Sequence, residues 1–283
     1  MALTSRGIDH SLEEPPLDFR MREIAISTVD GEVVSAGVAA AGREAVGGIT
    51  FVLVHGFTGG WREKRGIAVA AHLARFGKVM AIDLRGHGKS SGRSTIGFDE
   101  VLDVDAAVAQ AKTNDPDGSV ITVGFSMGGS IVLRHGALAP GRHFTPSHVP
   151  DAVVSVSSPG FWFYRGTKIM RTVHRLIESP AGRAALALKG VRITSTPWPE
   201  PPPLSPEQCV KRIVDIPVLI LHGDADHYFP IEHARVLERA VIESGNARSS
   251  VKVIPGLGHA ESAVDPATMD IVGAWSRETA SVS

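Results

Sequence analysis

The sequence predicts an α/β fold with a mostly parallel central sheet, helices on both of its faces and an inserted, partly helical cap. Two patterns predict it. Short apolar, β-branched runs alternate with longer segments of helical periodicity. One stretch without a strand pattern, residues 157–216, interrupts this alternation. With 283 residues, 43% of them hydrophobic, the chain can bury the core of one large domain of this kind.

Eight runs are candidate strands, and the Asp30-Gly31 pair between the first two predicts a hairpin. These runs are Glu23–Val29, Glu32–Ala39, Ile49–Val54, Val79–Ile82, Val120–Gly124, Ala152–Val156, Val218–Leu221 and Val251–Ile254. The candidate helices are Glu63–Arg75, Phe98–Lys112, Met127–Ala139, Ile231–Ser244 and Pro266–Arg277. Strands joined by helices form parallel sheets, in which functional residues collect at the carboxyl ends of the strands.

The segment without strands is better explained as a cap than as a loop, because unstructured loops of that length are uncommon. Ile169, Val173, Leu176 and Ile177 fall on one helical face, so the cap should contain at least one helix. A proline-rich stretch, 197–203, would return to the core as a stiff connector. The expected organisation is an N-terminal tail at residues 1–20, an α/β core at 21–158 and 208–283, and a cap insertion at 159–207.

Composition limits the classes of function. A net charge of −1 provides no overall basic field for nucleic acid. The single cysteine, Cys209, cannot form an internal disulfide, and no Cys/His cluster predicts a metal site. No apolar run approaches the roughly 20 residues that span a bilayer, and the N-terminus lacks a signal-peptide core. We expect a cytoplasmic protein with no cofactor, no nucleic-acid partner and no integral membrane segment. Its richness in Arg, Ala, Gly and Val suggests a GC-rich bacterial genome.

The stretch V-I-T-V-G-F-S-M-G-G-S, residues 120–130, contains a G-x-S-x-G motif with a strand before it and a helix after it. A serine on such a corner is strained, with its hydroxyl pushed outward. Gly124 and Gly128 have no Cβ to collide across the corner, and the helix from Met127 directs its N-terminal amides toward the site. The context therefore predicts that Ser126 is a nucleophile rather than a simple turn residue.

A nucleophilic serine needs a base and an acid that orients the base, and this arrangement supplies them in the order Ser, acid, His. The loop after the strand at 218–221 carries two acids, Asp224 and Asp226. The loop after the strand at 251–254 carries His259. Both loops should lie at the carboxyl edge of the sheet, and both aspartates remain candidates on this argument.

The chain has 12 histidines, and His259 is preferred as the base. It follows Gly256 and Gly258, whose flexibility lets the loop carry a side chain back over the site. The nearest rival, His227, would have to displace an acid from its own loop.

The oxyanion formed by attack on a carbonyl needs two donors. One should be the backbone amide of Met127. The other should come from the loop H-G-F-T-G-G at 55–60, where the amide of Phe57 is the candidate. Loss of one such donor typically lowers the rate by about 10²–10³.

Four motifs, in order, give the sequence its resemblance to the α/β-hydrolase superfamily over about residues 20–277, apart from the cap. The motifs are H-G-F-T-G-G at 55–60, D-L-R-G-H-G-K-S at 83–90, G-F-S-M-G-G at 124–129 and G-L-G-H at 256–259. The resemblance implies that Asp226 is the acid, because it occupies the family's G-x-x-D position before a proline, and that Asp224 is a turn residue. It also implies that Arg85 and His87 shape the site.

The resemblance narrows the class of hydrolase. A serine at the nucleophile position differs from haloalkane dehalogenases and epoxide hydrolases, which use an aspartate. The motifs are most similar to the monoacylglycerol-lipase, serine-aminopeptidase and cofactor-free haloperoxidase branches. The cap matches no pattern. In it we expect Phe161 and Trp162 to line an acyl pocket and the surrounding Lys and Arg residues to face water.

The sequence thus predicts a serine hydrolase that cleaves a small-molecule carboxylic ester through an acyl-enzyme, without cofactor or metal. Thioesterase, amidase or peptidase, and perhydrolase activity on the same residues remain alternatives. A different class, a receptor-like α/β-hydrolase that binds a ligand with little turnover, also remains open. The sequence does not predict an oligomeric state.

Overall fold

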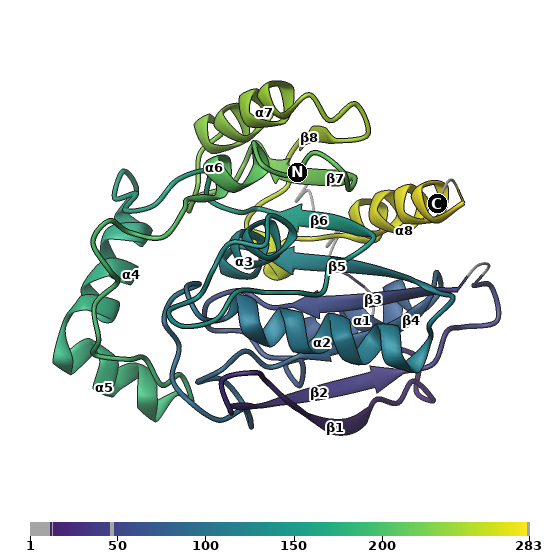
Figure 1. Ribbon diagram of the computed structural model, residues 1–283, viewed down its shortest axis with the longest axis horizontal. Coiled ribbons are helices and arrows are strands. Elements are labelled where there is room, and N and C mark those ends of the chain that lie inside the picture. The colour runs from purple at the N-terminus through teal and green to yellow at the C-terminus, as the bar shows by residue number, and fades with distance from the viewer. Residues whose placement is uncertain (1–11, 13, 46–47, 282–283) are drawn as a thin grey trace, which may run out of the picture.

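The computed structural model describes residues 12, 14–45 and 48–281, so most of the expected N-terminal tail lies outside the described residues. An eight-stranded sheet crosses the described chain (Figure 1). Its strands are β1 (Arg22–Ser27), β2 (Val33–Ala39), β3 (Ile49–Val54), β4 (Lys78–Ile82), β5 (Ser119–Phe125), β6 (Ala152–Val156), β7 (Val218–Gly223) and β8 (Ser250–Ile254).

The spatial order of the strands is β1-β2-β4-β3-β5-β6-β7-β8. β1 pairs antiparallel with β2 through the hairpin at Asp30-Gly31, and β2 pairs antiparallel with β4. Every pairing from β4 to β8 is parallel. All eight predicted strands are present, and the mostly parallel sheet is confirmed.

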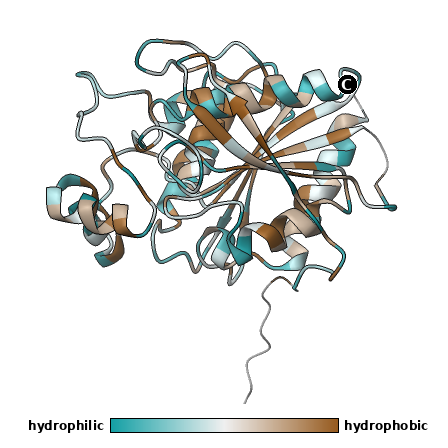
Figure 2. Ribbon diagram, turned by 90° about the horizontal axis from the view of Figure 1, so that it is seen from below, coloured by the Kyte–Doolittle hydropathy of each residue, from teal (hydrophilic) through white to brown (hydrophobic). Residues whose placement is uncertain are grey.

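Helices cover both faces of the sheet, as expected. They are α1 (Lys64–Leu73), α2 (Val101–Asn114), α3 (Met127–Gly136), α4 (Lys168–Glu178), α5 (Pro180–Leu188), α6 (Pro206–Val210), α7 (Glu232–Ser244) and α8 (Pro266–Ala280), with a 3₁₀ turn η1 (Ala260–Ser262). Helices α1 and α8 pack on one face, and α2, α3, α6 and α7 pack on the other. The hydropathy colouring shows apolar strands at the centre, between these helices (Figure 2).

Alternation along the strands builds two cores. In β3, Phe51 and Leu53 join the core beneath α1 and α8, whereas Val52 and Val54 join the core beneath α2 and α3. All six residues of β3 are buried, so the strand is apolar on both faces and the sheet needs helices on both sides.

Two helix ends differ from the prediction. α2 begins at Val101 rather than Phe98, because the carboxylate of Glu100 accepts hydrogen bonds from the amides of Thr95 (2.8 Å) and Gly97 (2.9 Å) and holds the preceding segment in a turn. α3 ends at Gly136 rather than Ala139, and Leu138 beyond it has a left-handed φ of +50°.

The predicted cap segment contains the expected helix, α4, and two that were not predicted. The Ser179 side chain caps α5 with Pro180 at its first position, and Ser205 and Gln208 form a capping box at α6. The expected boundary between residues 207 and 208 falls inside α6. In two views, α4 and α5 stand apart from the sheet (Figures 1 and 2).

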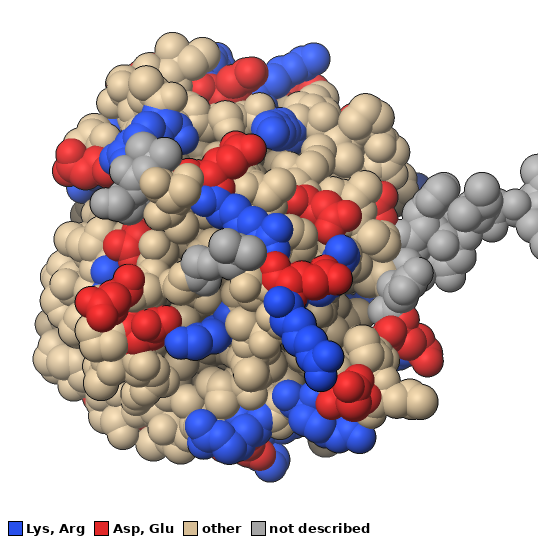
Figure 3. Space-filling model, turned by 90° about the vertical axis from the view of Figure 1, so that its right-hand side faces the viewer, with Lys and Arg blue, Asp and Glu red and all other residues tan. Residues whose placement is uncertain are grey.

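On the side of the molecule opposite α4 and α5, basic and acidic side chains are interspersed (Figure 3). This mixture accords with the net charge of −1. Within the described residues, no helix combines the length and apolarity that crossing a membrane requires.

Candidate active site

Ser126 stands on the corner between β5 and α3, with φ +51° and ψ −115°. A residue other than glycine rarely adopts this backbone conformation, and strain of this kind gathers at functional sites. Close backbone packing holds it. A Cβ on Gly124 would lie 2.2 Å from the carbonyl oxygen of Gly128, and one on Gly128 would lie 2.3 Å from that of Val54. The predicted need for both glycines is therefore a matter of direct backbone contact.

The structure brings Ser126, His259 and Asp226 into one hydrogen-bonded line. His259 Nδ1 lies 2.8 Å from Asp226 Oδ2, and its Nε2 lies 2.9 Å from Ser126 Oγ. A carboxylate only accepts, so Nδ1 carries the proton and Nε2 is left to accept from the serine hydroxyl. These residues come from three separate loops at the carboxyl edge of the sheet.

Asp226 is buried, and its other oxygen, Oδ1, accepts hydrogen bonds from the amides of Tyr228 (2.8 Å) and Phe229 (3.0 Å). Its orientation is therefore fixed. Asp224 is exposed and accepts from the amide of Gly256 at 2.6 Å, as expected for a turn residue. Of the two candidate acids, only Asp226 meets His259.

The imidazole of His259 is held between aromatic rings. Tyr228 stacks on it with centroids 4.0 Å apart, and Phe229 meets it edge-on at 5.5 Å. The rival His227 is exposed. His222 is buried and donates from Nε2 to the carbonyl of Phe229 at 2.8 Å, which is a structural role.

Hydrogen bonds from two histidines fix the loop at 55–60. His87 Nε2 lies 2.5 Å from the carbonyl oxygen of Phe57. His55 donates from Nδ1 to the carbonyl of Gly56 at 2.6 Å and accepts at Nε2 from the amide of Leu84 at 3.0 Å. Burial lowers the pKa of His55 to about 3, which keeps this tautomer neutral. His87 thus shapes the loop, as expected.

Arg85 is also structural, because it pairs with the carboxylates of Asp30 (2.7 Å) and Asp103 (2.8 Å).

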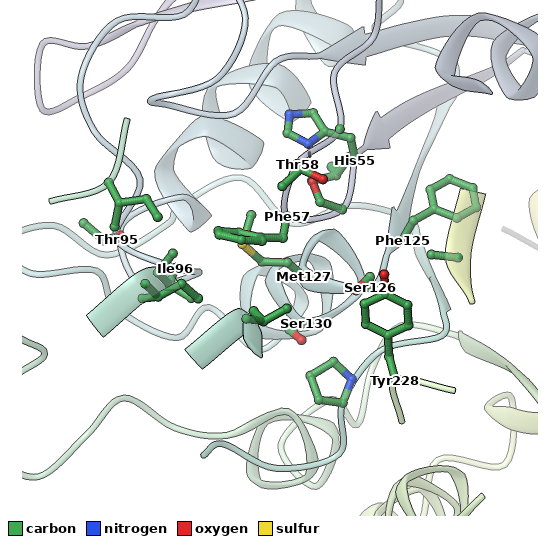
Figure 4. Close-up of a pocket in the computed structure, with 18 of the residues that line it drawn as sticks. His55, Phe57, Thr58, Thr95, Ile96, Phe125, Ser126, Met127, Ser130 and Tyr228 are labelled. Atoms are coloured by element: carbon green, nitrogen blue, oxygen red, sulfur yellow. Dashed lines mark hydrogen bonds between the residues drawn. The ribbon is translucent and has the colours of Figure 1, made fainter. Parts of the chain in front are cut away.

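Among the described residues, the backbone amides of Phe57 and Met127 have no acceptor within the protein. Both residues border the pocket beside Ser126 (Figure 4). The amides predicted to hold the oxyanion are therefore free for a ligand.

Ser126 and His259 open into a pocket of about 1140 Å³. One wall comes from the core, including Phe57, Ile96 and Met127 (Figure 4). The other comes from the predicted cap, through the apolar side chains of α4 and residues near both ends of the segment. These cap residues include Phe161, Trp162, Met170, Val173, Leu176, Ile177 and Trp198.

Phe161 and Trp162 line the pocket as expected, but they also hold the structure together. Phe161 stacks on His233 at 4.4 Å, and Trp162 donates from Nε1 to the carbonyl of Pro203 at 2.8 Å. Sequence reasoning missed Trp198 and Ile96. Trp198 lies in the stretch interpreted as a connector, and its proline neighbours were the only signal there. Ile96 has an unusual φ of +57° that its sequence did not indicate.

Lys168, Arg171 and Arg175 of α4 are exposed and do not border the pocket, as expected. Arg165, which precedes α4, pairs with Glu178, whereas Arg183 of α5 borders the pocket. Within the described part of the chain, no cluster of three or more His, Cys, Asp or Glu side chains has the arrangement of a metal site.

Residues 51–268 match the model of the alpha/beta hydrolase family. The chain belongs to this family. A curated relative, a non-heme haloperoxidase of Rhodococcus erythropolis, is 30% identical over an alignment of 235 residues, and the match covers 68% of this alpha/beta hydrolase and 79% of the relative. A monoacylglycerol lipase of Mycolicibacterium smegmatis is 26% identical over an alignment of 241 residues, and the match covers 70% of this chain and 82% of that protein.

Solved structures agree on the fold. An esterase of Pyrococcus furiosus aligns with a TM-score of 0.65 at 21% identity and covers 92% of this chain and 93% of its own. Est1E from Butyrivibrio proteoclasticus aligns with a TM-score of 0.60 at 19% identity, covering 91% and 98%. The expected superfamily is confirmed, and the family with its esterase- and lipase-like relatives supports an enzyme of the hydrolase type.

Proposed function

We propose that this alpha/beta hydrolase is a serine hydrolase that cleaves carboxylic esters through an acyl-enzyme intermediate. The observation that carries the proposal is the line of hydrogen bonds from Ser126 through His259 to Asp226, with Ser126 opening into a largely apolar pocket. A nucleophile, a base in contact with it and a buried acid that orients the base form the arrangement that acyl transfer requires.

In the first half-reaction, Ser126 Oγ attacks the ester carbonyl carbon while its proton passes to His259 Nε2. Asp226 stabilises the imidazolium, and the amides of Phe57 and Met127 donate to the oxyanion. The bond from carbon to the alcohol oxygen then breaks, and the alcohol leaves with the proton from His259.

In the second half-reaction, water attacks the acyl-serine and gives its proton to His259. The bond to Ser126 Oγ breaks, the carboxylic acid leaves, and Oγ recovers the proton. No metal or organic cofactor enters either half-reaction as we propose it.

We propose further that residues 159–207 act as a cap that forms the acyl site, with Phe161 and Trp162 in its wall. The pocket exceeds the roughly 300–1,000 Å³ of an ordinary small-molecule site. Its size and apolar lining favour a medium or long acyl chain over acetate.

The haloperoxidase relative favours a second candidate, acyl transfer to hydrogen peroxide in place of water. Peroxide would attack the same acyl-serine and leave as a peracid, with His259 taking its proton. Peracid formed from an ester and peroxide, and lost on substitution of Ser126, would support this side activity.

Hydrolysis of p-nitrophenyl esters from acetate to palmitate tests the proposal. Wild-type protein should turn over esters, with a maximum beyond acetate, and Ser126→Ala should lose activity by about 10⁵–10⁶. Ser130→Ala is the matched control. It removes the buried hydroxyl of a serine in the first turn of α3, and that hydroxyl has no hydrogen-bond partner, so the variant should lose no more than about tenfold. Folded wild-type protein with no turnover of any ester would contradict the proposal and favour a ligand receptor.

A further inference from the structure

Glu261 is a carboxylate at the centre of the site that the proposed mechanism does not use. It lies in η1, two residues after His259, and borders the pocket. Its Oε1 accepts a hydrogen bond from the amide of Gly56 at 2.5 Å. A Cβ on Gly56 would stand 3.2 Å from Glu261 Oε2 and 3.4 Å from the Cβ of Ser126. Oε2 of Glu261 and the nucleophile therefore approach the same point.

This carboxylate lacks a cation. Among the described residues, no Lys or Arg forms an ion pair with it. The side chain is half-buried, and burial raises the pKa of its carboxyl. An unpaired carboxylate that is partly removed from water is unfavourable, and a bound cation would relieve that cost.

The position of Glu261 assigns it to one part of an ester. His259 Nε2 must pass its proton to the leaving oxygen, so the alcohol portion lies on the His259 side of Ser126. Tyr228, which stacks on His259, marks that side, and the apolar wall of Phe57, Ile96 and Met127 lies on the other (Figure 4). Glu261 lies in η1, the turn that directly follows His259, and from this we infer that it serves the alcohol portion of the ester rather than the acyl chain.

We propose that Glu261 makes the site selective for esters whose leaving alcohol carries a positive charge, which are esters of amino alcohols. The inference rests on the proposed function and names its substrate class. A cation beside Oε2 neutralises the carboxylate next to the forming oxyanion. A neutral leaving group leaves that negative charge uncompensated and slows the attack.

The test is a pair of isosteric esters, butyrylcholine and 3,3-dimethylbutyl butyrate, which differ in charge but hardly in shape. At pH 8, wild-type protein should favour the cationic ester in kcat/KM by about tenfold or more. In Glu261→Gln the amide oxygen can still accept from Gly56, so the loop keeps its hydrogen bond while the charge is removed. The ratio of the two kcat/KM values should fall about tenfold in this variant.

A ratio that Glu261→Gln leaves unchanged would overturn the inference. The inference would also be overturned if Glu261→Gln behaved as wild type while Glu261→Ala slowed both esters equally, because Glu261 would then only position the loop. A change confined to a second pair, 2-hydroxyethyl and propyl butyrate, would also overturn it, because a hydroxyl donor and not a cation would then be selected.

Binding separates this inference from the proposed function. In the Ser126→Ala background, which cannot form an acyl-enzyme, binding is measured by calorimetry. Glu261→Gln should weaken the binding of butyrylcholine about tenfold relative to the binding of the neutral ester. If this holds while wild-type protein hydrolyses no ester, the proposed function fails, and only the binding of a cation at Glu261 is supported. If Ser126-dependent hydrolysis of p-nitrophenyl butyrate is found, but Glu261→Gln changes neither the ratio of kcat/KM values nor the ratio of binding affinities, the inference fails and the proposed function stands.

Discussion

The edge of the sheet around Ser126 and the α4–α5 segment form opposite walls of the same pocket but are built differently. At the sheet edge, Ser126 and Asp226 are buried, and each functional group has a fixed hydrogen-bond partner. In α4, no residue is fully buried, and its apolar side chains are only partly covered. The core therefore holds the groups that we propose to react, whereas α4 and α5, which we propose to contact the substrate, have fewer packing constraints.

The segment is nevertheless attached to the core at defined points. The amide of Arg192 donates to the carbonyl of Gly86 (2.8 Å), and the amide of Ser94 donates to the carbonyl of Arg192 (2.7 Å). Leu186, Val191 and Ile193 form a small apolar cluster beside Phe57 and Ile96. Changes in α4 should therefore alter selectivity while leaving the reacting groups in place.

The largest expected effect comes from a substitution at the sheet edge that should lower the catalytic rate. Asp226→Asn should lower kcat by about 10³–10⁴, because the amide favours the wrong tautomer and orientation of His259. Asp224→Asn is the matched control in the same loop, and its loss should stay within about tenfold because Asp224 only closes a turn with Gly256. Steady-state kinetics on one ester compares them, and equal losses would show that the acid is misassigned.

Backbone packing gives the next largest effect. Gly128→Ala places a Cβ 2.3 Å from a core carbonyl, so unfolding free energy should fall by about 3 kcal/mol or more. A Cβ on Gly190, after α5, would meet nothing within 4 Å, so the cost of Gly190→Ala comes only from the left-handed φ of +84°. Its unfolding free energy should fall by about 1 kcal/mol. Urea unfolding of both variants makes the comparison. A larger loss at Gly190 would reverse our description of the two regions.

His233 links the two regions and should give a smaller, pH-dependent effect. It accepts at Nδ1 from the amide of Gly160 and stacks on Phe161, while its buried Nε2 has no partner. Burial lowers the pKa of His233 to about 4. The unfolded chain, with a pKa near 6.5, binds this proton first, so stability falls as the pH drops from about 6.5 toward 4.

The unfolding free energy of wild-type protein falls between pH 7 and pH 5. In His233→Asn this fall should be smaller by about 1–2 kcal/mol, after allowance for partial screening. Urea unfolding at both pH values measures it, with exposed His227→Asn as the control that leaves the slope in place. An identical slope in wild type and His233→Asn would show that folding does not lower the pKa of His233.

The smallest effect concerns selectivity. Leu176→Ala enlarges the α4 wall of the pocket, so the preferred p-nitrophenyl ester should lengthen and its kcat/KM should change by about 3- to 10-fold. Because Leu176 is only partly buried, the unfolding free energy should fall by less than about 2 kcal/mol. A large loss of stability with an unchanged chain-length profile would place Leu176 in the core rather than in an acyl site.

The same contrast explains how much the sequence could predict. All eight strands were predicted, because strand periodicity is a local signal. Ser126 and His259 were predicted from the sequence around each residue, whereas Asp226 was distinguished from Asp224 by the resemblance to α/β hydrolases. Glu261 was not predicted, since its significance depends on Gly56, which lies far away in the sequence and meets it only in the folded chain. Trp198 was missed for the same reason, because it reaches the pocket through contacts with Trp162 and the carbonyl of Thr95.

The central claim is that Ser126 is a nucleophile activated by His259. Covalent labelling with a fluorophosphonate, followed by peptide mass spectrometry, tests it most directly because it needs no knowledge of the substrate. We predict stoichiometric modification of Ser126 in wild-type protein, strongly slowed labelling in His259→Ala and none of that peptide in Ser126→Ala. Folded wild-type protein that remains unlabelled, or is labelled at another residue, would contradict the account.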